Sequence, residues 1–246
     1  MATEFTSRRI LLRGMAAWFA LLLVAAGTPV QADNLRIGII GTGKIGGALA
    51  RHWAGAGHEL VISSRNPEKL EPLAAELGDR VRTGTPAEAA RFGEVVLVAI
   101  PYGAMPQIGR DYAALLAGKV VLDTGNPFLG RDGEMARDAQ EKGAGIASAE
   151  YLPGSRLVRA FNCIPAWSLA NSANREPARI AIPIASDYPE ALAVAQRLVD
   201  DAGFDAVVVG SLIRSRSFDL GKELAHGNLD AAQLRRLVDQ RWPADD

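Results

Sequence analysis

The sequence predicts a single α/β domain with a doubly wound, mainly parallel sheet, and two observations support this prediction. Short apolar runs rich in β-branched residues alternate with helical patterns along most of the chain. This alternation is typical of strands joined by right-handed helical crossovers. The chain has 246 residues, of which 48% are hydrophobic and 22% charged. That composition is ordinary for a globular protein and sufficient for one well-buried core.

The first half of the chain gives the clearest pattern. A strand over 35–40 is apolar on both faces, as a buried parallel strand requires. It leads into a helix over 45–56 and a second strand over 59–63. A helix over 67–77 should follow, because a proline opens the segment and Gly78 ends it.

The rest of the chain continues this alternation, with no low-complexity linker and no internal repeat. Residues 125–145 are rich in glycine and predict a long irregular loop at the active site. The remaining expected elements are a strand near Val81, a helix from Pro86, strands over 95–100, 120–123, 157–161, 180–184 and 205–209, a helix over 189–202, and terminal helices over 215–226 and 230–240.

The amino terminus has the pattern of a targeting segment. The basic pair Arg8-Arg9 precedes an apolar run over 15–26, which is short for a membrane span. Paired arginines of this kind resemble the twin-arginine signal, which exports folded proteins. We therefore predict a signal peptide over 1–32 and a Rossmann-type domain over 33–246, periplasmic or otherwise extracytoplasmic, with no stable membrane anchor after cleavage. A general secretory signal and an uncleaved anchor are the alternatives.

Charge and cysteine content narrow the function classes. The formal net charge is −1, so no global field attracts nucleic acid or an anionic membrane. The single cysteine, Cys163, gives no intramolecular disulfide, and the three histidines lack ligand spacing. We expect no metal site and no nucleic-acid partner.

A glycine motif, G-x-G-x-x-G, separates the first expected strand from the first expected helix. Its first glycine permits a tight turn, its second lets the backbone approach a pyrophosphate, and its third lets helix and strand pack closely. The helix N-terminus adds free N–H groups and a positive dipole. This context predicts a Rossmann-type dinucleotide site formed by Gly41, Thr42, Gly43, Lys44, Ile45 and Gly46.

The end of the second strand indicates which dinucleotide binds. Domains that prefer NAD carry Asp or Glu there, whereas this chain has Ser63, Ser64 and Arg65. A guanidinium pairs with a 2′-phosphate, and a hydroxyl donates to it. Lys69, one helical turn on, adds a further positive charge, while Asn66 is placed to cap the next helix. We therefore predict NADP(H), held by Ser63, Ser64, Arg65 and Lys69.

With these motifs in place, the chain resembles the family of NADPH-dependent deazaflavin (coenzyme F420) reductases, and its nucleotide domain is similar to that of the six-transmembrane metalloreductases. The segments that carry the resemblance are 39–46, 63–65 with Lys69, 99–101, 158–166, 210–212 and 215–216. The resemblance implies that Ser64, Arg65 and Lys69 hold the 2′-phosphate. It also implies that Ala99, Ile100 and Pro101 lie beside the nicotinamide ribose, and that residues 162–165 lie where the nicotinamide meets a second redox ring.

The chain shows no Ser-His-Asp order, no paired catalytic carboxylates and no Tyr-x-x-x-Lys pair. Hydride transfer between a nicotinamide and a flavin-like ring needs stacking more than an acid or a base, so the catalytic residues stay unassigned. On the substrate side, at the carboxyl edge of the sheet, we expect Asn126, Asn162, Cys163 and Pro165.

Several of these positions have an alternative role. Pro101 either leaves backbone carbonyls facing the nicotinamide or only ends its strand. Asn126 either contacts a ligand or forms an Asx turn, and Cys163 is more simply a small buried apolar residue. Trp167, at the start of a helix, either stacks on a ring or packs in the core.

The leading hypothesis is an NADP(H)-dependent oxidoreductase that passes hydride to or from a deazaflavin or a flavin. Its partner would be a small-molecule redox acceptor. Two alternatives remain open: an exported NADP(H)-binding module without turnover, and a small imine or carbonyl reductase, which needs a proton donor. The amphipathic segment 215–240 offers an interface for a homodimer.

Overall fold

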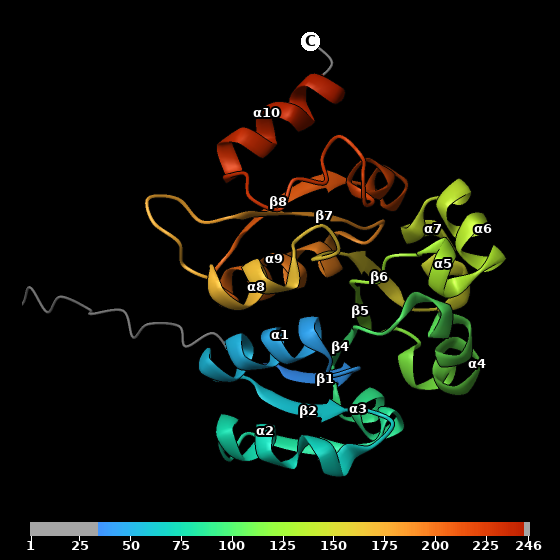
Figure 1. The fold of residues 1–246 in the computed structure, drawn as a ribbon, viewed down its shortest axis with the longest axis vertical. Coiled ribbons are helices and arrows are strands. Elements are labelled where there is room, and N and C mark those ends of the chain that lie inside the picture. The colour runs from blue at the N-terminus through green and yellow to red at the C-terminus, as the bar shows by residue number, and fades with distance from the viewer. Residues whose placement is uncertain (1–33, 244–246) are drawn as a thin grey trace, which may run out of the picture. The chain divides into compact units, whose positions relative to one another are not determined.

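The computed structural model describes residues 34–243, whose strands form one eight-stranded sheet (Figure 1). The strands are β1 (Arg36–Ile40), β2 (Glu59–Ser63), β3 (Val81–Gly84), β4 (Val95–Val98), β5 (Val120–Asp123), β6 (Arg156–Arg159), β7 (Ala181–Ala185) and β8 (Asp205–Gly210). Their order is β3-β2-β1-β4-β5-β6-β7-β8, and among these strands only β6 and β7 pair antiparallel. The predicted single domain with a doubly wound, mainly parallel sheet is confirmed. The signal peptide predicted over 1–32 lies outside the described residues.

Helices cover both faces of the sheet (Figure 1). They are α1 (Lys44–Gly55), α2 (Glu71–Leu77), α3 (Pro86–Phe92), α4 (Met105–Leu116), α5 (Leu129–Asp132), α6 (Glu134–Lys142), α7 (Ala144–Tyr151), α8 (Ala166–Asn171), α9 (Pro189–Asp201) and α10 (Ala231–Arg241), with 3-10 helices η1 (Pro67–Leu70), η2 (Tyr102–Ala104) and η3 (Leu212–Phe218). Apolar residues of α1, α2, α8 and α9 pack on one face, and those of α3, α4, α6 and α7 on the other. None of the helices within residues 34–243 is long and apolar enough to cross a membrane.

The alternation of side chains along β1 explains this layering. Ile37 and Ile39 point into one buried cluster, and Ile40 points into the other. Gly38 faces α3, where a Cβ atom would lie 2.0 Å from the carbonyl oxygen of Ala89. A glycine is needed there because α3 packs directly on the backbone of β1.

The reversal between β6 and β7 places the C-terminal part of the chain beside the site. The two strands pair only through Arg159 and Ala185, so their carboxyl ends meet. Beyond β8, the segment after η3 returns to the end of β6, where the side-chain amide of Asn162 donates to the carbonyl of Phe218 at 2.8 Å. Residues distant in sequence therefore reach the carboxyl edge of β5 and β6.

The prediction of an irregular loop over 125–145 is wrong. This stretch holds α5 and α6 and the start of α7. Gly133 and Gly143 have positive φ values of 66° and 94° and lie at the junctions between these helices. The glycines thus end short helices rather than mark irregular chain. Ala136 and Ala139 bury one side of α6.

Two expected helices also differ from prediction. The segment 67–77 is divided into η1 and α2, because Pro72 lies in the first turn of α2 and has no N–H to continue a helix from η1. The helix expected over 215–226 is absent: η3 ends at Phe218, and a turn follows in which the Lys222 N–H donates to the Asp219 carbonyl at 2.9 Å. The helix expected over 230–240 is confirmed as α10.

Candidate nucleotide and substrate site

The glycine turn joins β1 to α1 at the carboxyl edge of the sheet. Gly41 has a φ of +96°, and a Cβ atom on it would lie 2.5 Å from the carbonyl oxygen of Ala99. A Cβ atom on Gly46 would lie 2.1 Å from the carbonyl oxygen of Gly41. The protein itself therefore requires both glycines.

Gly43 is different, because no atom lies within 4 Å of the place where its Cβ atom would be. Its φ of −86° is one that other residues adopt. Packing around this position therefore does not require a glycine. The open space lies at the amino end of α1, where backbone N–H groups bind phosphate. An approaching pyrophosphate fits this open cradle.

Ser63 holds the glycine turn from the neighbouring strand. Its carbonyl oxygen accepts from the N–H groups of Gly41 and Thr42 at 3.2 and 3.1 Å, and from the Thr42 hydroxyl at 3.1 Å. Its own hydroxyl is buried and donates to the Ile39 carbonyl at 2.7 Å. Ser63 was predicted among the cofactor-binding residues, and its buried hydroxyl is already bonded within the sheet, so any contact with the nucleotide stays a prediction.

Arg65 and Lys69 are exposed beyond the end of β2, and neither has an ion-pair partner within residues 34–243. Ser64 is half-buried, and its Oγ accepts from the N–H of Asn66 at 3.1 Å, which leaves its hydroxyl proton available. Asn66 itself makes no side-chain cap bond. Two cations that form no ion pair within the described residues fit a 2′-phosphate, although the exposed carboxylate of Glu68 lies between them in the chain.

The loop after β4 lies against the glycine turn. The Ala99 N–H donates to the Ile40 carbonyl at 2.9 Å, and Ile100 Cγ2 is 2.7 Å from the position of a Cβ atom on Gly41. Pro101 is exposed and precedes η2, and its carbonyl accepts from the Ala104 N–H at 2.9 Å. Because β4 already ends at Val98, Pro101 opens η2 rather than ending the strand.

A buried ion pair lies under the carboxyl edge of β5 and β6. Asp123 and Arg159 are the last residues of these strands and register partners, and both side chains are fully buried. Arg159 Nη1 lies 2.8 Å from Asp123 Oδ2, and Nη2 lies 3.2 Å from Asp219 Oδ1. Burial alone disfavours the guanidinium charge, but the charges of Asp123 and Asp219 outweigh it and raise the pKa of Arg159.

Two hydroxyls complete this buried cluster, which we call the edge network (Tyr102, Asp123, Ser148, Arg159 and Asp219). Ser148 donates to Asp123 Oδ2 at 2.7 Å, and the Tyr102 hydroxyl donates to the Ala144 carbonyl at 2.8 Å and lies 3.0 Å from Ser148 Oγ. Burial and the charge of Asp123 raise the pKa of Tyr102, so it stays a neutral donor. The sequence reading missed this network, although charged residues closing two apolar strands were a signal.

Asn126 links the loops after β5 and β6. Its Nδ2 donates to the Asn162 carbonyl at 2.7 Å, and its Oδ1 accepts from Arg159 Nη2 at 3.3 Å. The side chain thus bridges two loops, which neither predicted role described. Asn162 is buried, and its Oδ1 has no protein partner within the described residues. Phe161, with a φ of +58°, sets this turn in a strained conformation.

Cys163 and Pro165 lie in the same loop but differ in their exposure to solvent. Cys163 is buried, as its interpretation as a small apolar residue requires, whereas Pro165 is exposed at the start of α8. A Cβ atom on Gly227 would lie 2.5 Å from Pro165 Cδ, so the segment after η3 packs on this loop. Trp167 is 72% exposed, which contradicts the core packing taken as its default.

Burial raises the pKa of the Cys163 thiol to about 12. At pH 8 the native thiol should therefore be protonated and protected, because the thiolate is the reactive form. We expect no measurable reaction with an aromatic disulfide reagent in native protein at pH 8, and one thiol per chain in denaturant. Stoichiometric labelling of the native protein would show that this thiol is accessible.

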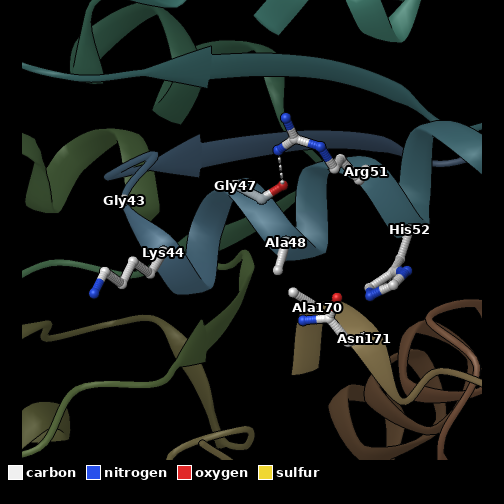
Figure 2. Close-up of a pocket in the computed structure, with 8 residues that line it drawn as sticks. All are labelled: Gly43, Lys44, Gly47, Ala48, Arg51, His52, Ala170 and Asn171. Atoms are coloured by element: carbon white, nitrogen blue, oxygen red, sulfur yellow. Dashed lines mark hydrogen bonds between the residues drawn. The ribbon is translucent and has the colours of Figure 1, made fainter. Parts of the chain in front are cut away.

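A cavity of about 340 Å³ lies beside the glycine turn (Figure 2). It runs along α1 from Gly43, with α8 on its other side. Two polar groups on its wall are already bonded: Arg51 pairs with Glu76 at 3.0 Å, and His52 Nε2 lies 2.7 Å from the Leu169 carbonyl oxygen. It extends the open surface next to Gly43. Its lining is Gly43, Lys44, Gly47, Ala48, Arg51, His52, Ala170 and Asn171.

The fold and the glycine turn define a dinucleotide-binding domain of the Rossmann class. The chain matches the family model "NADP oxidoreductase coenzyme F420-dependent" over residues 36–127. It is 32% identical over 196 residues to the F420-dependent NADP reductase of Methanothermobacter marburgensis, covering 74% of this chain and 87% of that protein. The chain therefore belongs to the family of F420-dependent NADP reductases, as the resemblance predicted.

Two further similarities agree with this assignment. Metalloreductase STEAP3 of Rattus norvegicus is 29% identical over 193 residues, covering 77% of this chain but only 37% of that protein. The crystal structure of a hypothetical protein from Sinorhizobium meliloti superposes with a TM-score of 0.70 at 26% identity, covering 82% of this chain and 97% of that one. Contacts of individual residues with nucleotide or acceptor stay predictions, as does a homodimer.

Proposed function

We propose that this protein is an NADP(H)-dependent oxidoreductase that transfers hydride between the nicotinamide and a deazaflavin acceptor, or a flavin in its place. One observation supports this most strongly: Gly43 faces open space at the amino end of α1, and beyond the neighbouring strand lie Arg65 and Lys69, which form no ion pair with any described residue. A relative that is 32% identical is named an F420-dependent NADP reductase. The geometry thus supports the nucleotide, and the family supports both the nucleotide and the reaction class.

Different residues of the chain bind different parts of the nucleotide. The N–H groups at the start of α1 hold the pyrophosphate, and the absence of a side chain at Gly43 lets them approach it. Arg65, Lys69 and the Ser64 hydroxyl hold the 2′-phosphate. Ala99 and Ile100, which lie against the turn, support the nicotinamide ribose.

For hydride transfer at this edge, the protein must orient the two rings and exclude water from between them. When bound, the nicotinamide supplies or accepts the hydride. The edge network fixes the ends of β5 and β6, and Asn126 ties their loops together. A rigid platform of this kind keeps two rings at a constant distance. Because the edge network has no exposed acid or base, we assign it to positioning.

Steady-state oxidation of NADPH by purified protein tests this proposal. We expect turnover with a deazaflavin, and slower or comparable turnover with flavins, each followed by loss of nicotinamide absorbance. Tight binding of NADPH without oxidation by any of these acceptors would identify a binding module instead. Oxidation only in the presence of small imines or carbonyl compounds would identify the third class of function.

We also propose that the protein is exported in folded form and acts in the periplasm or elsewhere outside the cytoplasm, because Arg8-Arg9 precedes an apolar run and small residues. Fractionation of cells that express the full chain tests this. An Arg8→Lys, Arg9→Lys variant should stay in the cytoplasm while the parent protein is exported. Equal distribution of the two proteins would contradict the twin-arginine route.

A further inference from the structure

A cleft of about 270 Å³ lies between η3, the turn that follows it, and the end of α10. Four cationic side chains and one carboxylate line it, together with an indole ring, in a protein whose formal net charge is −1. We call it the basic cleft, and its charged and aromatic residues are Arg214, Arg216, Lys222, Glu223, Arg241 and Trp242.

Most of the positive charge in the basic cleft has no counter-ion among residues 34–243. Arg241 Nε pairs with Glu223 Oε1 at 3.2 Å. Within residues 34–243, Arg214, Arg216 and Lys222 form no ion pair. Like charges this close repel one another, so the cleft gains stability when an anion enters it.

The donors of the basic cleft are held in place. The Arg214 guanidinium lies over the Trp242 ring, 4.7 Å from its centroid, and that of Arg241 lies 5.7 Å from the same centroid. The aliphatic part of Arg216 packs on Gly143, where a Cβ atom would lie 3.4 Å from Arg216 Cβ. Such fixed guanidinium groups lose little entropy on binding a phosphate or carboxylate.

The basic cleft adjoins the carboxyl edge of β5 and β6. The Lys222 N–H donates to the Asp219 carbonyl at 2.9 Å. Asp219 in turn accepts from Arg159 in the edge network at 3.2 Å and from the Ala144 N–H at 3.0 Å. A single turn of chain therefore separates the cleft from the place where an acceptor ring would lie.

The predicted 2′-phosphate site lies elsewhere. Arg65 follows β2, and β1, β4 and β5 separate β2 from β6. With strands about 4.8 Å apart, β2 and β6 are roughly 19 Å from each other across the sheet. The charge of the basic cleft is thus not explained by the nucleotide.

We propose that the basic cleft binds the phosphate- or carboxylate-bearing side chain of the redox acceptor while its ring lies at the carboxyl edge of β5 and β6. This inference depends on the proposed function, because that function supplies the ring-bearing acceptor. It makes the anionic side chain, in addition to the ring, a determinant of which acceptor binds.

Two acceptors that differ by one phosphate test the inference. Riboflavin and its 5′-phosphate, and the corresponding 5-deazaflavins, are titrated into the protein, and their dissociation constants are measured by fluorescence. We expect the phosphorylated member of the preferred pair to bind at least tenfold more tightly. An Arg216→Gln, Lys222→Gln variant should bind both members equally, with NADPH affinity unchanged. Higher ionic strength should weaken only the phosphorylated ligand.

Arg235→Gln with Arg236→Gln is the matched control, since both residues are exposed on α10 and neither lines the cleft. It should keep the tenfold preference. Equal binding of the two members by the parent protein, binding of neither, or a preference that survives in the cleft variant would overturn the inference. Separately measured NADPH oxidation tests the proposed function, so the two failures can be told apart.

Discussion

A Gly43→Ala variant is expected to keep the fold, with a loss of at most about 1 kcal/mol because alanine is a poorer N-cap residue than glycine, and to bind NADPH at least tenfold more weakly. No atom lies within 4 Å of the new methyl group, and the backbone there is extended with a φ of −86°. The protein therefore tolerates alanine, whereas a pyrophosphate in contact with the backbone does not. Thermal unfolding and calorimetric titration with NADPH measure the two quantities.

Gly55→Ala is the matched control, because it makes the same change at the other end of α1, also in open space. It should leave NADPH affinity unchanged and stabilise the helix slightly. Gly41 and Gly46 cannot serve this purpose, since a methyl group on either would meet backbone at 2.5 Å or less. Unchanged NADPH affinity in Gly43→Ala would show that no ligand approaches this turn closely.

An Arg159→Met variant is expected to lower the free energy of unfolding by about 3–5 kcal/mol. The substitution leaves the fully buried Asp123 carboxylate without its cationic partner, 2.8 Å away in the parent protein. It also releases Asn126 and Asp219, which both accept from Arg159. Unfolding in guanidinium chloride measures the loss.

Arg156→Met is the matched control in the same strand. Arg156 lies 3.5 Å from Glu190, and both side chains are partly exposed. Such a pair contributes at most about 1 kcal/mol. If the Arg159 variant were destabilised no more than the Arg156 variant, Arg159 would not be the residue that stabilises the edge network.

The sequence predicted the central strands because burial on both faces demands continuous β-branched and apolar residues. Val95 to Val98 is a run of this kind, and it forms β4 between β1 and β5. The glycine turn was equally predictable, since its function lies in six consecutive residues. The direction of the Ser63 side chain was not, because both faces of β2 are buried and strand alternation does not show that its hydroxyl bonds to the Ile39 carbonyl.

The edge network was not predicted from the sequence, because it joins segments that lie far apart in the chain. Asp123 and Arg159 meet as register partners of the parallel strands β5 and β6. Asp219 joins them because β7 runs antiparallel to β6 and the chain returns to the end of β6. The segment after η3 forms a turn instead of a helix because the Asp219 carboxylate accepts from Arg159 and from the Ala144 N–H. Long-range contacts, rather than local helix propensity, therefore determine the conformation of the segment after η3.

Calorimetric titration with NADPH and with NADH tests the central claim most directly, namely that the carboxyl edge beside Arg65 binds NADP(H). We expect at least tenfold tighter binding of NADPH, about 1.4 kcal/mol. This preference should be lost in Arg65→Ala and kept in Arg110→Ala, which removes an exposed arginine on α4. Equal affinity for the two nucleotides, or binding of neither, would contradict it.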